Sequence, residues 1–278
     1  MITLEALIFV FIAGLITDLA TGLGAVPFFF KNDFSDRWLV GLWGLAAGIM
    51  GAASVFGLIP QGLAEGQVLE VIFGLSLGVG LVVVARKLID EHELEPGEFK
   101  EADLKRLILI LGVLTVHSFP EGVAIGVSFA ELGFEGGIPI LGFAVPMLAI
   151  SMTIAISIHN IPEGIAISIP FKSMGMSNWR MLGATIFSSV PQPIGAVIAF
   201  YFVRQAQIFL PIGFGFAAGA MLYLVGTEFI DEAKDQGESL VDWKRSFSVG
   251  CVAGLIIMLP LLLIGDASFA QLIQGLIS

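Results

Sequence analysis

The sequence predicts an all-α polytopic membrane protein, and three observations support this prediction. Hydrophobic residues make up 56% of the 278 residues and charged residues only 13%, whereas soluble domains contain about 45–50% apolar and about 25% charged residues. The apolar residues are gathered in continuous runs of roughly 20 residues, the length that crosses a bilayer core of about 30 Å. A transmembrane barrel would instead show alternating segments of about ten residues, and none are evident.

Eight membrane spans are expected within a single transmembrane domain that covers residues 1–278. Each span is an apolar run that ends at charged or turn-forming residues. The first run lacks the basic leader and small-residue cleavage site of a signal peptide, so we expect it to be retained. The spans are expected near residues 4–29, 38–59, 67–90, 104–130, 141–169, 180–203, 208–232 and 246–266.

The distribution of basic residues predicts the orientation of the spans. With eight spans, every lysine and arginine except Arg204 falls in or beside the loops that follow spans 1, 3, 5 and 7. Lysine and arginine concentrate on the cytoplasmic side of membrane proteins. We therefore expect a multi-pass protein of the cell membrane whose two termini both lie outside the cytoplasm.

Charge and cysteine content exclude several classes of function. The formal net charge of −11 argues against nucleic-acid binding, which requires a basic face. Cys251 is the only cysteine in the sequence, so a disulfide framework and a cysteine-based zinc or iron–sulfur site are ruled out.

Two near-identical segments lie in the expected spans 4 and 5. Residues 117–125 read HSFPEGVAI, and residues 159–167 read HNIPEGIAI. An ionisable side chain at membrane depth costs about 3 kcal/mol or more, so such residues are retained mainly where they face a cavity and serve a function. The repetition of this costly pair predicts one functional site shared by the two spans.

The spacing within each segment suits a metal ion. Histidine and glutamate four residues apart lie on one helix face, which pairs His117 with Glu121 and His159 with Glu163. The proline between them frees a backbone carbonyl, and irregular backbone at this depth is tolerated only beside a cavity or protein wall. Imidazole nitrogens and carboxylate oxygens are ligands for Zn²⁺ and similar dications, and two glutamates balance the charge of one such ion.

Other interpretations of the repeated motif compete with metal binding. Packing through His–Glu hydrogen bonds needs no duplicated buried carboxylate and is disfavoured. A proton relay without metal is the more serious rival, because chains of histidine and glutamate also serve pumps. A zinc protease would carry H-E-x-x-H, whereas Ser118 and Asn160 follow the histidines here; the general base is missing, and the chain is not expected to be an enzyme.

The doubled H-x-x-P-E-G motif on the fourth and fifth of eight spans resembles the ZIP (Zrt/Irt-like) metal transporters, in particular their GufA-like branch. Small-residue stretches at residues 21–25, 46–50 and 216–221 also fit, so the resemblance extends over nearly the whole chain. It implies that spans 1–3 and 6–8 are inverted repeats around a central pair formed by spans 4 and 5. It also implies alternating access, in which spans 1, 4, 5 and 6 move as a unit against the others.

The resemblance further implies which residues bind metal. The primary site of the family corresponds to Met50, His117, Glu121, His159 and Glu163. A second, adjacent position is built in the family from the residue after each histidine and a glutamate of span 6. This chain carries Ser118, Asn160 and Gln192 there, so two potential anionic ligands are neutral. We therefore hypothesise that the second site is weak or absent, with Asn160 and Gln192 as neutral oxygen ligands or as hydrogen-bond partners of the ligands.

Residues and resemblance together predict transport of a divalent transition-metal cation toward the cytoplasm, Zn²⁺ first, with Fe²⁺, Mn²⁺ and Cd²⁺ as further candidates. Glu228 in span 7 is a candidate for the exit route, and a solvated helix end is the alternative. A proton-coupled transporter, a metal exporter and, more weakly, an intramembrane metallohydrolase remain alternatives. The cation is a substrate, and no prosthetic group is expected. The expected partners are the metal ion and the lipid bilayer, without nucleic acid; a homodimer stays an open expectation.

Overall fold

The structure, a computed structural model, describes residues 2–31, 34–90, 118–134, 137–173 and 175–264. His117 and the first half of the expected span 4, near residues 104–130, lie outside the described residues. The second half of that span contains the helical residues 118–128. The other elements are α1 (Leu4–Leu23), a 3₁₀ turn (Val26–Phe29), α2 (Asp36–Ala52), a π-helical turn (Ala53–Leu58), α3 (Ile59–Glu65), α4 (Val68–Asp90), β1 (Ile138–Ile140), β2 (Phe143–Val145), α6 (Met147–Ser173), α7 (Asn178–Ser189), α8 (Pro191–Gln205), a 3₁₀ turn (Gln207–Phe209), α9 (Leu210–Leu224), a second π-helical turn (Val225–Phe229), α10 (Ile230–Gln236) and α11 (Trp243–Ile264).

Within the described residues, seven helical stretches are long and apolar enough to cross a membrane, which confirms the expected fold class of an all-α polytopic membrane protein. Three of these stretches each contain two α-helices: α2 with α3, α7 with α8, and α9 with α10. They correspond to the expected spans 1, 2, 3, 5, 6, 7 and 8. Their bounds are Leu4–Phe29, Asp36–Glu65, Val68–Lys87, Met147–Ile169, Asn178–Gln205, Gln207–Gln236 and Trp243–Leu262.

The start of span 5 differs from the expectation. Helix α6 begins at Met147 rather than near residue 141, because the preceding residues form the antiparallel hairpin β1–β2. Leu141 and Gly142 at its tip have φ values of 48° and 85°, as a two-residue hairpin turn requires. The apolar run is therefore divided by a turn that hydropathy alone does not reveal.

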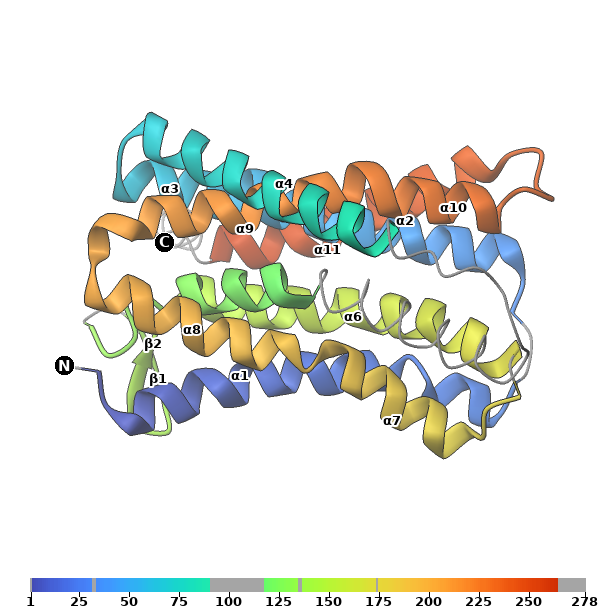
Figure 1. The fold of residues 1–278 in the computed structure, drawn as a ribbon, viewed down its shortest axis with the longest axis horizontal. Coiled ribbons are helices and arrows are strands. Elements are labelled where there is room, and N and C mark those ends of the chain that lie inside the picture. The colour runs from blue at the N-terminus through green and yellow to red at the C-terminus, as the bar shows by residue number, and fades with distance from the viewer. Residues whose placement is uncertain (1, 32–33, 91–117, 135–136, 174, 265–278) are drawn as a thin grey trace, which may run out of the picture.

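The helices pack into two groups (Figure 1). The first group contains α2, α3, α4, α9, α10 and α11, with the most extensive contacts between α2 and α11 and between α4 and α9. The second contains α1, α6, α7, α8 and the helical residues 118–128, with α1 packed on α6 and α8. This division separates spans 2, 3, 7 and 8 from spans 1, 5, 6 and the described part of span 4, the same units that the family resemblance implies.

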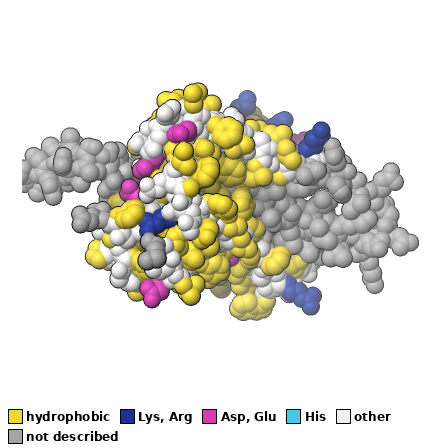
Figure 2. All heavy atoms as spheres, turned by 60° about the vertical axis from the view of Figure 1, so that its left-hand side comes forward, with side chains coloured by type: hydrophobic (Ala, Val, Ile, Leu, Met, Phe, Trp, Pro, Cys, Tyr) yellow, Lys and Arg dark blue, Asp and Glu magenta, His cyan; other side chains and the backbone are white. Residues whose placement is uncertain are grey.

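The outer surface of the helices is apolar. Figure 2 shows a face dominated by hydrophobic side chains, with few charged groups in its middle. Large apolar side chains such as Ile16, Phe73 and Ile256 are about half exposed or more. A soluble protein rarely exposes a continuous apolar surface of this kind, so these side chains are suited to contact lipid.

Glycine residues set the distance between α2 and α11. Gly44 and Gly48 lie against the backbone of Phe247 and Cys251, so that a Cβ atom at either glycine would collide with a backbone carbonyl. Small residues at helix contacts allow backbones to approach closely in membrane proteins, where packing rather than burial from water drives association. A larger residue at these positions must push the two helices apart.

Replacing Gly48 by alanine should lower the stability of the protein, because the added Cβ overlaps the Cys251 carbonyl. Overpacking of this kind destabilises by about 1–3 kcal/mol. Gly51→Ala is the matched control, since a Cβ at Gly51 meets no atom within 4 Å. Thermal unfolding of the purified variants in detergent measures the difference, and equal melting temperatures would contradict the assigned packing.

Candidate metal centre

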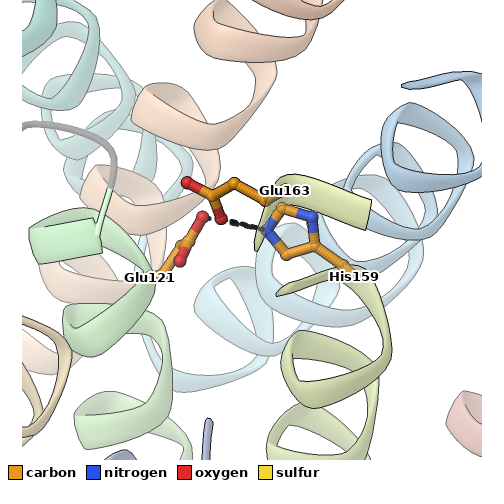
Figure 3. A group of neighbouring side chains, drawn as sticks. All are labelled: Glu121, His159 and Glu163. Carbon is orange, nitrogen blue, oxygen red and sulfur yellow. Dashed lines mark hydrogen bonds and ion pairs between the residues drawn. The ribbon is translucent and has the colours of Figure 1, made fainter. Parts of the chain in front are cut away.

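Three buried side chains converge at the centre of the second helix group. Glu121 projects from the helical residues 118–128, and His159 and Glu163 project from α6; each offers one ligand atom, and these atoms lie within 4.8 Å of one another. His159 Nε2 lies 2.9 Å from Glu121 Oε1 and 3.8 Å from Glu163 Oε2. Figure 3 shows the imidazole and both carboxylates pointing toward one another.

The local sequence explains how α6 presents two of these groups. His159 and Glu163 are one helical turn apart and therefore lie on one face. Helix α6 runs without interruption through Pro162, which lacks an N–H and so leaves the carbonyl of Ile158 without its usual helical donor. The motif thus places an imidazole, a carboxylate and a backbone carbonyl without that donor within one stretch of helix.

The glycine of each motif brings another helix close to the ligands. Gly122 lies against the backbone of Gln192 in α8, and Gly164 lies against the backbone of Thr21 in α1. A Cβ at either position would collide with a backbone oxygen. These glycines therefore permit close contacts between helices beside the ligands.

The charge of the cluster favours a cation. Two carboxylates and one imidazole are almost fully buried, and buried charges must be paired or bind a metal to be tolerated. Ligand atoms around Zn²⁺ lie about 2.0–2.2 Å from the ion, so they are at most about 4.4 Å apart. The three ligand atoms lie within 4.8 Å of one another, which is close to this limit, and the residues present therefore fit one dication.

Each of the three positions of the expected second site makes hydrogen bonds within the protein, and two of them, Asn160 and Gln192, are bonded to each other. Gln192 Nε2 donates to Glu121 Oε2, and Gln192 Oε1 lies 3.0 Å from Asn160 Nδ2 and 2.8 Å from Thr17 Oγ1. Ser118 Oγ is 3.4 Å from the carbonyl oxygen of Ser188 in α7. Gln192 is thus a direct hydrogen-bond partner of Glu121, and Asn160 is connected to Glu121 only through Gln192.

An aromatic pair covers one side of the site. The rings of Phe229 and His159 have centroids 5.9 Å apart at an interplanar angle of 32°, and Trp43 packs on Phe229 at 5.2 Å. Phe229 ends the π-helical turn between α9 and α10, and such turns are frequent at functional sites. Phe229 therefore closes the site toward the first helix group.

Two further expected site residues, Glu228 and Met50, do not belong to this cluster of three. Glu228 Oε1 lies 2.8 Å from Arg86 Nε of α4 in an ion pair, and Glu228 does not belong to the cluster of three. Met50 lies on α2 and is buried in the main hydrophobic core of the protein. Its role as a ligand, like that of His117 outside the described residues, stays a prediction.

Sequence reasoning missed Thr17 and Phe229. Thr17 and Thr21 are four residues apart in a largely apolar span, and this polar stripe was the available signal for a buried contact. Phe229 gives no such signal, because phenylalanine is frequent in every span and the contact depends on how α9 and α10 pack against α6.

The fold and the site define a polytopic helical membrane protein with a buried cluster suited to a divalent cation. The family model of the ZIP Zinc transporter matches residues 87–262. The chain belongs to the ZIP zinc transporter family, which confirms the resemblance expected from its paired motifs.

Three relatives illustrate the match. A candidate zinc transporter of Arabidopsis thaliana is 37% identical over 85% of this chain, which spans only 36% of that longer protein. The zinc transporter GufA of Myxococcus xanthus is 30% identical, with 90% of this chain and 96% of that protein covered. The zinc transporter ZIPB of Bordetella bronchiseptica is 32% identical, with 86% and 76% covered. These relatives are named as transporters rather than enzymes.

Neutralising one carboxylate of the cluster should weaken Zn²⁺ binding. We expect Glu121→Gln to reduce the affinity of the purified protein by more than the roughly 10–100-fold typical of residues outside the coordination shell. Glu131→Gln is the matched control, because Glu131 is exposed near the end of the same segment. Isothermal titration calorimetry measures both, and an unchanged affinity in Glu121→Gln would argue against this site.

Proposed function

We propose that this protein carries divalent transition-metal cations, Zn²⁺ foremost, across the cell membrane toward the cytoplasm. The observation that supports this most strongly is the buried cluster of Glu121, His159 and Glu163 in a protein whose helices are long and apolar enough to cross a membrane. The names of the relatives, which are zinc transporters, support the same substrate. Fe²⁺, Mn²⁺ and Cd²⁺ are further candidate substrates, since selectivity depends on geometry and metal availability as well as on ligand type.

The proposed site binds one ion at a time. Glu121 and Glu163 supply oxygen ligands and balance the charge of the ion, and His159 supplies a neutral nitrogen. We assign His117 and Met50 as further ligands by their correspondence with the primary site of the family. Binding of a second ion is unfavourable because Ser118, Asn160 and Gln192 are uncharged. Glu121 and Glu163 already balance the charge of the first ion, so no further carboxylate of the cluster is left for a second one.

Movement of the ion is proposed to follow from the two helix groups. The cluster belongs to the group that contains α1, α6, α7 and α8, and Phe229 of the other group covers it. Displacement of one group against the other would uncover His159 on one side of the membrane at a time. A midplane site at the contact between two helix units is a recurrent arrangement in transporters.

The direction of transport is proposed from the charges at the helix ends. Arg86, Lys172, Lys234 and Arg245 lie at the ends assigned to the cytoplasm by the distribution of basic residues. Glu228, held by Arg86, is at that end of span 7 and is proposed to line the exit route. Both termini then lie outside the cytoplasm.

Reconstitution into liposomes tests the proposed transport. We expect the protein to move ⁶⁵Zn²⁺ down its gradient, and we expect Glu163→Gln to lose most of this flux because one of the two charge-balancing oxygens becomes neutral. Glu238→Gln, at an exposed position after α10, should transport normally. A Glu163→Gln flux equal to that of the unchanged protein would refute the assigned ion pathway.

Acidification should weaken metal binding. Ligand histidines bind metal only when they are neutral, so protons compete with the ion as the pH falls through the imidazole range. We expect the Zn²⁺ affinity to decrease steadily from about pH 7 to about pH 5.5. Calorimetric titrations across this range that show a constant affinity would count against histidine ligation.

A further inference from the structure

We propose that Asn160 is a positioning residue: it sets the orientation of the Gln192 amide, and through this amide it holds the Glu121 carboxylate in place for the metal ion. This inference rests on the proposed function, because positioning Glu121 for a metal ion presupposes that the site binds a metal ion. It assigns to Asn160 a role that acts through hydrogen bonds instead of direct contact with metal.

The orientation of the Asn160 side chain is determined by a backbone carbonyl of α1. Asn160 Nδ2 lies 2.8 Å from the carbonyl oxygen of Thr17, and a carbonyl oxygen can only accept a hydrogen bond. The nitrogen of the amide must therefore face α1, whichever way the two ends of the amide are first assigned. The side chain is fully buried, so the contact is shielded from solvent.

The orientation of Asn160 in turn determines that of Gln192. The same Nδ2 group lies 3.0 Å from Gln192 Oε1, so the end of the glutamine amide that faces Asn160 must be the acceptor. The other end, Nε2, then faces Glu121 and donates to its Oε2. Because Gln192 is also fully buried, no exchange with solvent donors competes for its oxygen.

Thr17 does not determine this orientation through its hydroxyl. Thr17 Oγ1 lies 2.8 Å from Gln192 Oε1 and 2.8 Å from the carbonyl oxygen of Gly14. A hydroxyl has one hydrogen and can also accept, so it is compatible with either end of the glutamine amide. Asn160 Nδ2 and the acceptor-only carboxylate of Glu121 each permit only this orientation, and Asn160 is the one of the two that lies outside the metal-binding cluster.

Both carboxylate oxygens of Glu121 therefore have a hydrogen-bond partner. Oε2 accepts from Gln192, and Oε1 lies 2.9 Å from His159 Nε2. A reversed Gln192 amide would place a carbonyl oxygen against the carboxylate, which is repulsive in a buried setting where electrostatic interactions are strong. Asn160 thus keeps the carboxylate in one orientation, with Oε1 toward the metal position.

The rival role for Asn160 is that of an oxygen ligand. Its Oδ1 has no hydrogen-bond partner among the described residues, and this is the atom that a metal ligand would use. Asn160→Asp separates the two roles, because aspartate keeps this oxygen, has nearly the same size and adds a negative charge, yet it loses both N–H donors.

Calorimetric Zn²⁺ titration of the purified full chain gives the decisive comparison. If Asn160 acts by positioning, Asn160→Asp weakens Zn²⁺ binding by about 10–100-fold, the loss usual for residues that orient a ligand. An affinity that is unchanged or higher would overturn the proposal and assign Asn160 to the metal. Ser168→Ala is the control on α6: Ser168 is buried and donates to the carbonyl of Gly164 in its own helix, outside this hydrogen-bond chain.

A double-mutant cycle tests whether the effect passes through Gln192. Once Gln192→Leu has removed the glutamine amide, the additional change Asn160→Ala should cause no further loss of Zn²⁺ affinity, since interacting residues are non-additive. Losses that multiply would show that the two residues act independently and would contradict the proposal. This cycle also serves if Asn160→Asp does not fold, as monitored by the thermal unfolding of each metal-free variant.

His159→Ala distinguishes failure of this inference from failure of the proposed function. If His159→Ala still binds Zn²⁺ with full affinity, the metal site itself is misassigned. If His159→Ala loses binding while Asn160→Asp keeps it, the site stands and only the positioning role of Asn160 is refuted.

Discussion

The rest of the structure depends on one constraint: the negative charges of two buried carboxylates, Glu121 and Glu163, must be balanced. Glu163 lies in a helical stretch long and apolar enough to cross a membrane, and Glu121 is buried beside it; an uncompensated charge is costly at membrane depth. His159 Nε2 lies within hydrogen-bond distance of one Glu121 oxygen, at 2.9 Å, and Gln192 donates to the other oxygen of that carboxylate. The negative charge of the two carboxylates favours a cation over a neutral solute at this position.

This compensation requires helices that approach closely, and small residues supply the necessary space. Gly122 allows α8 to bring Gln192 to the carboxylate, and Gly164 allows α1 to lie beside α6. The same device joins α2 to α11 in the other helix group through Gly44 and Gly48. Each group is thus tightly packed within itself, which is the condition for moving as a unit.

The all-α membrane fold and the buried His–Glu cluster could be predicted from the sequence because both follow from local rules. The length of an apolar run predicts a span, and the four-residue spacing of His159 and Glu163 places both on one face of α6. The start of α6 at Met147 could not be predicted from hydropathy, since the turn at Leu141 and Gly142 interrupts an apolar run. The surroundings of the site also escaped prediction: the contact of Phe229 with His159 joins segments far apart in the chain and depends on helix packing.

X-ray absorption at the zinc K-edge of the purified protein, loaded with one equivalent of Zn²⁺, tests the central claim most directly. The account predicts a first shell containing nitrogen and oxygen atoms at about 2.0–2.2 Å, together with the outer-shell scattering of imidazole. A spectrum of a hydrated ion without imidazole scattering would show that the buried histidine and carboxylates do not hold the metal, and it would contradict the account.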